Sequence, residues 1–212
     1  RIQSNGVIEN INFIDATISA KGYLGIVAGQ NSGSITNCYI EGTITGTSYI
    51  GGITGTNQGI ISSSIFSGTA TGTSYRVGGI AGYNSGGIAN SIASGTITGS
   101  SDVGGISGMN YVTGTPVYIS NSYSLCSVNG KNSGGLVAYN DSSAVIQNSY
   151  WNTETSGMLT SDGGEGKTTT EMKLKPTYAG WDFGSVWGMN SSDNNGYPFL
   201  QWQGYTDETL PI

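Results

Sequence analysis

The stretch Gly51-Gly52-Ile53-Thr54-Gly55-Thr56-Asn57 decides the fold because the chain repeats it. Closely similar stretches occupy residues 78–84 and 104–110, and weaker copies occupy residues 25–31 and 134–140. The asparagines that close the five copies are 26, 27, 26 and 30 residues apart: Asn31, Asn57, Asn84, Asn110 and Asn140. A fixed period of this size is typical of stacked supersecondary units, so the sequence predicts a solenoid.

Within each repeat, three short segments alternate with Gly, Asn and Ser turns, which predicts three strands per coil. A glycine every few residues excludes helix, and β-branched residues favour strands. We therefore expect an all-β parallel β-solenoid over residues 1–150, with about 26 residues per coil. One apolar residue of each repeat is expected to stack in a ladder: Ile35, Ile61, Ile88, Ile119 and Ile146.

Glycine and asparagine in the repeat have structural explanations. Gly-Gly pairs such as Gly51-Gly52 are expected where the backbone takes a positive φ or lies close to the next coil. The asparagine column is expected to form a corner ladder, with side-chain amides hydrogen-bonded from coil to coil. One repeat contains extra residues ending at Pro116, which predicts a surface loop over residues 111–116.

The repeat stops after Tyr150, and composition then changes, since all four tryptophans follow: Trp151, Trp181, Trp187 and Trp202. Repeat arrays need a different terminal unit to cover the last open core. We therefore expect residues 151–212 to form an aromatic-rich C-terminal capping segment that plugs the solenoid end. An aromatic platform for carbohydrate is the competing interpretation. Thr168-Thr169-Thr170-Glu171 fits a capping box, which predicts a short helix through about Lys175, ended by Pro176.

Composition excludes several classes of function. The net charge is −6 and the seven basic residues are scattered, so we expect no nucleic-acid partner. The absence of histidine excludes zinc-peptidase motifs and Ser-His-Asp or Cys-His catalysis within these residues. No apolar run is long enough for a membrane span, so we expect no direct membrane insertion. No leader precedes Arg1 and the chain begins inside a repeat, so we expect it to be part of a longer protein.

Neither the cysteines nor the acidic residues predict a cofactor or metal site. The repeat register places Cys38 and Cys126 about three coils apart, farther than a disulfide can span, which predicts two free thiols. The string Asp193-Asn194-Asn195-Gly196 has the composition of an ordinary turn and lacks the ligand spacing of a calcium loop. We therefore expect no cofactor and no bound metal.

The repeat also carries a family resemblance. Gly-Gly-Ile-x-Gly-x-Asn-x-Gly-x-Ile, followed by Asn-Ser or Asn-Cys and Gly-Thr-Ile-Thr-Gly, resembles the GLUG repeat of large bacterial surface proteins. These include filamentous-haemagglutinin-like adhesins and non-catalytic parts of immunoglobulin-A-cleaving metallopeptidases. Residues 149–157, 180–183 and 196–202 also resemble the segment that often closes such arrays. The resemblance implies a right-handed, extracellular β-solenoid without catalytic residues, and Ala138 and Gly25-Ile26 depart from the repeat pattern.

The leading functional hypothesis is a non-enzymatic segment of a bacterial surface adhesin, located outside the cell or on its surface. It would act as a stalk or as a binding surface. Its expected partners are proteins or glycans on a host or neighbouring cell. The first coil, which starts at Arg1, would present an uncovered edge, and this edge predicts end-to-end self-association.

A second hypothesis comes from the third strand of each coil. There, hydroxyl residues flank one apolar residue and are expected to point outward, forming a Thr-x-Thr face that resembles the ice-binding faces of β-solenoid antifreeze proteins. The predicted binding residues are Thr17, Ser19, Thr43, Thr45, Thr69, Thr71, Thr96 and Thr98. Ser127-Val128-Asn129 breaks the array in the fifth coil, and threonine is also common on strand surfaces.

A third hypothesis is a polysaccharide-active enzyme. Glycosidases use two carboxylates about 5 to 10 Å apart. Asp15 and Glu41 occupy equivalent positions in adjacent repeats, so they are expected about one strand spacing apart. A rim of solvated charge explains the same pair, and no basic residue that a lyase would need is close in sequence. We therefore expect no enzymatic activity and assign no catalytic residue.

Overall fold

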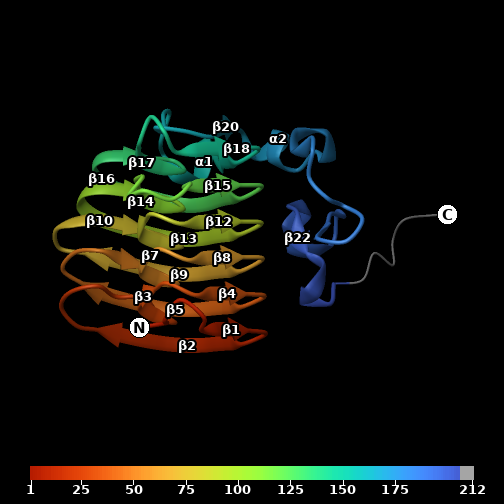
Figure 1. Ribbon diagram of the computed structural model, residues 1–212. Coiled ribbons are helices and arrows are strands. Elements are labelled where there is room, and N and C mark those ends of the chain that lie inside the picture. Colours follow the sequence, from red (N-terminus) through yellow and green to blue (C-terminus); the bar gives the residue numbers. More distant parts are fainter. Residues whose placement is uncertain (206–212) are drawn as a thin grey trace.

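A computed structural model describes residues 1–205 and confirms the parallel β-solenoid, whose coils are stacked along one axis in Figure 1. Each complete coil contributes one strand to each of three parallel sheets. We number the coils by their strands, from coil 1 (β3, β4, β5) through coil 2 (β7, β8, β9), coil 3 (β11, β12, β13) and coil 4 (β14, β15, β16) to coil 5 (β17, β18, β19).

The first sheet is built from strands of four residues: β3 (Ala28–Asn31), β7 (Thr54–Asn57), β11 (Ala81–Asn84), β14 (Ser107–Asn110) and β17 (Val137–Asn140). The second is built from strands of three residues: β1 (Val7–Glu9), β4 (Ser34–Thr36), β8 (Ile60–Ser62), β12 (Gly87–Ala89), β15 (Tyr118–Ser120) and β18 (Val145–Gln147). The third contains the longest strands: β2 (Asn12–Ser19), β5 (Tyr39–Gly46), β9 (Ile65–Gly72), β13 (Ile92–Gly104), β16 (Tyr123–Gly134), β19 (Tyr150–Asn152) and β20 (Glu165–Lys167), with β6 (Ile50–Gly51) and β10 (Tyr75–Gly78) at its margin.

The register between coils matches the sequence repeat. Ile35 pairs with Ile61, Ile61 with Ile88 in turn, and the same column continues through the second sheet. The isoleucines at the centre of this column are fully buried. Burying such a side chain contributes roughly 1.5–3 kcal/mol, so the apolar columns supply the main driving force for stacking.

The asparagine column forms the predicted ladder inside the solenoid. Each side-chain amide donates to the amide oxygen of the next coil, at 2.8 Å from Asn31 to Asn57 and 2.6 Å from Asn84 to Asn110. The Asn57–Asn84 and Asn110–Asn140 links complete the ladder. Because a buried polar group is costly without a partner, the ladder needs asparagine in every coil.

The glycine pairs are explained by close approach rather than by a positive φ. A Cβ atom on Gly52 would lie 2.2 Å from the ring of Phe66 and 2.3 Å from the carbonyl oxygen of Gly79 in the next coil. Neither Gly51 nor Gly52 has a positive φ. Of the two expected roles, only close contact with the neighbouring coil is therefore confirmed at this pair.

Residues 111–117 form the predicted loop between β14 and β15. The register also places the two cysteines as expected, since Cys126 pairs with Gly95 in coil 3 while Cys38 lies at the start of β5 in coil 1. Both are free, buried thiols.

Residues 151–162 cover the end of the solenoid at coil 5. The Trp151 ring lies against Gly135, and its Nε1 donates to the Met158 carbonyl at 3.3 Å. The Ser161 hydroxyl oxygen accepts a hydrogen bond from the Val137 backbone at 2.9 Å. These contacts, with the short helix α1 (Thr153–Ser156), satisfy the edge that coil 5 would otherwise expose.

The remaining aromatic residues do not plug the solenoid end, so that prediction was wrong for all but Trp151. They run down the flank of the solenoid, where Figure 1 shows the blue segment beside the stacked coils. Trp181 Nε1 donates to Asn148 near coil 5, whereas Trp202 Nε1 donates to Ser63 in coil 2 at 2.8 Å. They pack on an outward column that includes Ile65, Ile92 and Tyr123, because those apolar side chains also need to be buried.

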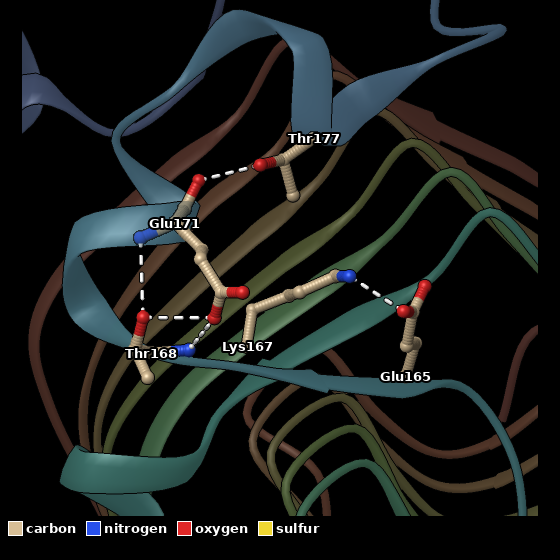
Figure 2. A network of polar contacts seen from close by, with 5 residues as sticks. All are labelled: Glu165, Lys167, Thr168, Glu171 and Thr177. Carbon is tan, nitrogen blue, oxygen red and sulfur yellow. Dashed lines mark hydrogen bonds and ion pairs between the residues drawn. The ribbon is translucent and has the colours of Figure 1, made fainter.

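The chain leaves the solenoid through the polar network of Figure 2. Lys167 pairs with Glu165, and the capping box at Thr168 and Glu171 begins α2 (Thr169–Met172). Hydrogen bonds from Thr168 lower the pKa of the Glu171 carboxyl. The helix ends at Met172 rather than near Lys175, because Pro176 lies in a separate 3-10 turn, η1 (Lys175–Tyr178). The segment continues with β21 (Trp187–Gly188), η2 (Asp193–Gly196), β22 (Phe199–Leu200) and η3 (Gln201–Gln203).

Candidate binding faces

The Thr-x-Thr face exists as two parallel columns on the third sheet. Thr17, Thr43, Thr69 and Thr96 pair in sequence from β2 to β13. The second column pairs in the same register, with Ser19, Thr45, Thr71 and Thr98. Each pair flanks an inward residue, such as the fully buried Ile44, so the hydroxyl side chains point outward.

Exposure along the Thr-x-Thr face is uneven. Thr43 and Thr45 are exposed, whereas Thr69 and Thr71 in the next coil are half-buried. Thr98 pairs with Asn129, so the array ends where the sequence indicated. The face therefore offers regularly spaced hydroxyl and methyl groups over four adjacent strands.

A second face, which the sequence analysis did not identify, lies at the corner that precedes the first sheet and on that sheet's outer surface. Its aromatic rings form a continuous series of contacts: Tyr23–Tyr49 at 4.7 Å between ring centroids, Tyr49–Tyr83 at 6.2 Å, Tyr83–Tyr111 at 6.4 Å and Tyr111–Tyr139 at 6.4 Å. The five rings come from coils 1 to 5 in order. We call this surface, together with Tyr75 and Arg76, the tyrosine–arginine face.

Arg76 lies at the centre of the tyrosine–arginine face. Its guanidinium carbon is 4.8 Å from the ring centroid of Tyr49, 5.4 Å from Tyr75 and 5.3 Å from Tyr83. Nη1 donates to the Tyr49 hydroxyl, whereas Nε is buried and has no hydrogen-bond partner within residues 1–205. Arg76 also forms no ion pair with the residues that the structure describes.

The backbone at this corner is strained. Tyr49 and Arg76 occupy equivalent positions in successive coils, with φ of 55° and 62°, and the next two coils carry Asp102 and Asn132 there, also with positive φ. Side chains with a Cβ pay roughly 1–2 kcal/mol in this left-handed region, which asparagine tolerates best. The other left-handed corner of each coil carries the residues expected there: Asn10, Asn37, Ser63, Asn90, Asn121 and Asn148. Large side chains at the strained corner therefore call for an explanation other than backbone geometry.

The rings and the cation affect one another electrostatically. Partial burial raises the pKa of Tyr49, and the nearby Arg76 charge opposes that rise. Partial burial also raises the pKa of Tyr83, and the Arg76 charge opposes that rise as well. Both hydroxyls therefore remain protonated at neutral pH, and they can donate hydrogen bonds as well as accept them.

Beneath these rings lies a shallow hollow of about 430 Å³. It is lined by one cation and otherwise by uncharged side chains: Tyr23, Gln30, Tyr49, Thr56, Gln58, Arg76, Tyr83, Met109 and Tyr111. The sequence contains a partial signal for this face, because Tyr23 and Tyr49 are 26 residues apart, and Tyr83 and Tyr139 hold the same position of the repeat, where both pair with Met109. The contact between the two series requires the fold, since Tyr49 and Tyr83 are in different registers of the repeat.

The carboxylates of the enzyme hypothesis are also brought together. Asp15 and Glu41 line one open hollow of about 420 Å³ beside the Thr-x-Thr face. Glu41 accepts a hydrogen bond from the Tyr39 hydroxyl at 2.9 Å. Burial, followed by this contact, raises the pKa of Tyr39.

The two cysteine thiols and the acidic side chains are the remaining groups with possible chemical reactivity or metal affinity. Burial raises the pKa of Cys126 to about 12, and it also raises the pKa of Cys38. Both groups therefore remain neutral thiols at physiological pH, which makes them poor nucleophiles. Within residues 1–205, no three His, Cys, Asp or Glu side chains are close enough together to hold a metal ion. Asp193–Gly196 forms the expected turn, with Asn194 and Asn195 left-handed.

Two comparisons by sequence match part of the chain. Residues 73–98 match the model of the GLUG motif. A protein of Evansella cellulosilytica, provisionally named a Gly-rich membrane protein, is 35% identical over 100 residues, which is 43% of this chain. The chain spans only 11% of that relative's length. No helix within residues 1–205 is long and apolar enough to cross a membrane.

One comparison by structure covers nearly the whole chain. A crystal structure from Bacteroides ovatus, provisionally named an immunoglobulin A1 protease, superposes with a TM-score of 0.74. The superposition covers 93% of this chain and 69% of the other chain, at 24% sequence identity. This likeness concerns the fold. The chain is therefore a parallel β-solenoid that contains a GLUG motif.

Proposed function

We propose that this chain is a non-enzymatic binding segment of a larger bacterial surface adhesin, located outside the cell or on its surface. The observation that carries the proposal is the tyrosine–arginine face, where five stacked coils each present one ring of a continuous series. The GLUG motif and a much longer relative named as a membrane protein support a segment of a surface protein. Its partner would be a protein or glycan on a host or neighbouring cell.

The composition of the tyrosine–arginine face favours recognition over a purely structural role. Tyrosine, methionine and arginine are the residues enriched in binding surfaces, and tyrosine and arginine dominate binding hot spots. Tyr23, Tyr111 and Tyr139 are between 38% and 47% exposed, so their rings are open to a ligand. Stacking on a rigid solenoid lowers the entropy cost of binding, because the rings are already ordered.

The test is a binding screen of the full chain against neutral glycans, acidic glycans and cell-surface proteins. The variant Tyr111→Ser removes one exposed ring from the face, and Tyr205→Ser removes an exposed ring on the C-terminal segment as a matched control. We expect Tyr111→Ser to weaken binding by about 10-fold and Tyr205→Ser to leave it unchanged. Absence of any ligand, or equal loss in both variants, would refute the proposal.

The in-register Thr-x-Thr face favours ice binding as a second candidate function. Its two columns repeat regularly over β2, β5, β9 and β13, as a surface that orders water would require. Thermal hysteresis and ice shaping by the wild-type chain test this function. Thr69→Tyr should abolish both effects by placing a bulky ring within the array, and a wild type without hysteresis excludes the function.

The non-enzymatic part of the proposal has its own test. Asp15 and Glu41 are the pair that a polysaccharide-cleaving activity would use. We expect no turnover when a panel of polysaccharides is incubated with the chain and reducing ends are measured. Turnover that disappears in Glu41→Gln would show that the segment is an enzyme.

A further inference from the structure

We propose that the tyrosine–arginine face binds a carboxylate-bearing polysaccharide, with the carboxylate held by Arg76. This inference rests on the proposed binding function and names the class of its ligand. It starts from an unsatisfied cation. Only Lys167 among the seven basic residues forms an ion pair within residues 1–205, and Arg76 differs from the other cations because its guanidinium lies among three tyrosine rings.

The surroundings of Arg76 favour an external anion. Asp102 occupies the same corner in the next coil, but it forms no ion pair with Arg76, and the residues that line the hollow include no carboxylate. Three tyrosine rings hold the guanidinium in place, and among the described residues Nη1 has only the Tyr49 hydroxyl as a partner. Arg76 Nε is one of five buried side-chain atoms without a partner within residues 1–205, and the one among them that belongs to a charged group. A guanidinium that is fixed in this way forms strong, directional hydrogen bonds to carboxylates.

The rest of the hollow suits a sugar better than a simple anion. The C–H faces of sugar rings stack on exposed aromatic rings, and their hydroxyls need neutral donors and acceptors. Gln30, Thr56 and Gln58 supply such groups between the tyrosines. Both amides can donate and accept at the same time, as a hydroxyl requires.

The direction of the face favours a polymer over a single sugar. The series of ring contacts runs from Tyr23 in coil 1 to Tyr139 in coil 5, so it follows the solenoid axis. A linear polysaccharide presents similar rings at regular intervals and could contact several tyrosines at once. Each contact would be weak, but linked contacts raise the overall affinity.

The strained corner supports the same assignment. Arg76 holds a left-handed backbone conformation that asparagine would adopt at lower cost. This geometry also provides a useful variant, because Arg76→Asn suits the backbone and removes only the guanidinium. Loss of binding in that variant can therefore be separated from loss of folding.

The experiment measures binding of the full chain to polygalacturonate, alginate and hyaluronate, each beside its carboxyl-reduced form. We expect binding to at least one acidic polymer and a weakening of about 10- to 100-fold for its reduced form and for Arg76→Asn. Arg76→Lys should lie between the wild type and Arg76→Asn, because it keeps the charge but loses the planar fork. The control Lys175→Gln removes an exposed cation from the C-terminal segment and should bind normally.

The inference is overturned if none of the acidic polymers binds, if the reduced forms bind equally well, or if Arg76→Asn binds like the wild type while its thermal melting is unchanged. Binding of an acidic protein, or of a neutral glycan through Tyr111, would overturn this ligand class and leave the proposed binding function intact. If no ligand in the wider screen binds, both the ligand class and the proposed binding function are refuted. Weaker binding at higher salt is also expected, because the contact includes an ion pair.

Discussion

Two apolar columns run along the outside of this solenoid, and only one is covered. The covered column includes Ile65, Ile92 and Tyr123, and the C-terminal segment packs on it with Trp181 and Trp187. The bare column is the tyrosine–arginine face, where Tyr139 is 42% exposed. Residue type alone does not separate them, since both contain tyrosine at the period of the repeat.

Burial and charge distinguish the two columns. In the covered column, Tyr123 is fully buried, donates to the Pro198 carbonyl at 2.6 Å and accepts from Asn194 at 3.0 Å. Within residues 1–205, each column keeps one buried donor without a partner, Trp187 Nε1 in the covered column and Arg76 Nε in the bare column, but only the bare column carries this donor on a charged group among partly exposed rings. Fully buried rings are typical of a structural core, whereas partly exposed tyrosines around an arginine are typical of a binding surface. The predictions below test this distinction.

The largest effect is expected in the covered column. Trp187 is fully buried, and Trp187→Ala should lower the free energy of unfolding by about 3–5 kcal/mol, because it leaves a large cavity. Urea unfolding followed by tryptophan fluorescence measures the change. Trp202→Phe keeps the apolar contact and loses only the bond to Ser63, so it should cost far less. A loss below about 1 kcal/mol for Trp187→Ala would mean that the segment is only loosely attached.

The covered column should also make stability depend on alkaline pH. Burial raises the pKa of Tyr123 above its ordinary value of 10.0, so the folded chain keeps a proton that the unfolded chain loses. Stability is therefore fully present below pH 10 and falls as the pH rises above it. Between pH 10 and 11, Tyr123 contributes a loss of about 1 kcal/mol, because half of this tyrosine is already ionised in the unfolded chain at pH 10.

Urea midpoints at pH 8, 10 and 11 measure this dependence. Tyr123→Phe should be less stable at pH 8, because it loses two hydrogen bonds, and should show a shallower decline above pH 10. Cys126, with a pKa of about 12, and Tyr178 contribute to the slope that remains. An unchanged slope in Tyr123→Phe would show that the covered column opens before the tyrosine titrates.

A smaller effect is expected at the strained corner. Arg76→Asn relieves left-handed strain but loses stacking on three rings, and each contribution is about 1 kcal/mol. The net change in the free energy of unfolding should therefore stay within about 1 kcal/mol, as thermal melting can show. A loss of more than 2 kcal/mol would make Arg76 a structural residue and would weaken its assignment to a ligand.

The smallest effect is expected at the outer rings of the bare face. Tyr139→Ser should change the free energy of unfolding by less than about 0.5 kcal/mol, because the ring is already exposed to water. The same urea assay measures it beside Trp187→Ala. A loss comparable to that of a core residue would show that the two columns play the same role.

The repeat made most of the fold predictable. Residues at the same position of successive repeats pair in the structure, as Ile61 and Ile88 do, because each coil repeats its neighbour. The asparagine ladder, the loop at residues 111–117 and the separated cysteines follow from that register. The alignment of the Thr-x-Thr residues in two columns also follows from the register, while their binding role stays a prediction.

The C-terminal segment and the tyrosine–arginine face could not be predicted in the same way. Residues 168–205 have no repeat, so no register indicates which surface they cover, and the expected plug was wrong. Contact between Tyr49 and Tyr83 joins a corner of one coil to a strand of the next. Such contacts depend on how the corner of one coil is oriented relative to the strand of the next coil. The spacing of residues in the sequence does not contain that orientation.

The sequence by itself determined the solenoid, its register and its buried ladders, because those features depend on neighbouring coils with nearly identical sequence. Only the tertiary structure decided which outer columns are buried and which remain exposed. Burial of a column depends on a non-repeating segment that returns to pack against distant coils, as Trp202 does at Ser63. The exposed tyrosines gain their proposed role from that outcome, together with Arg76, which forms no ion pair within residues 1–205.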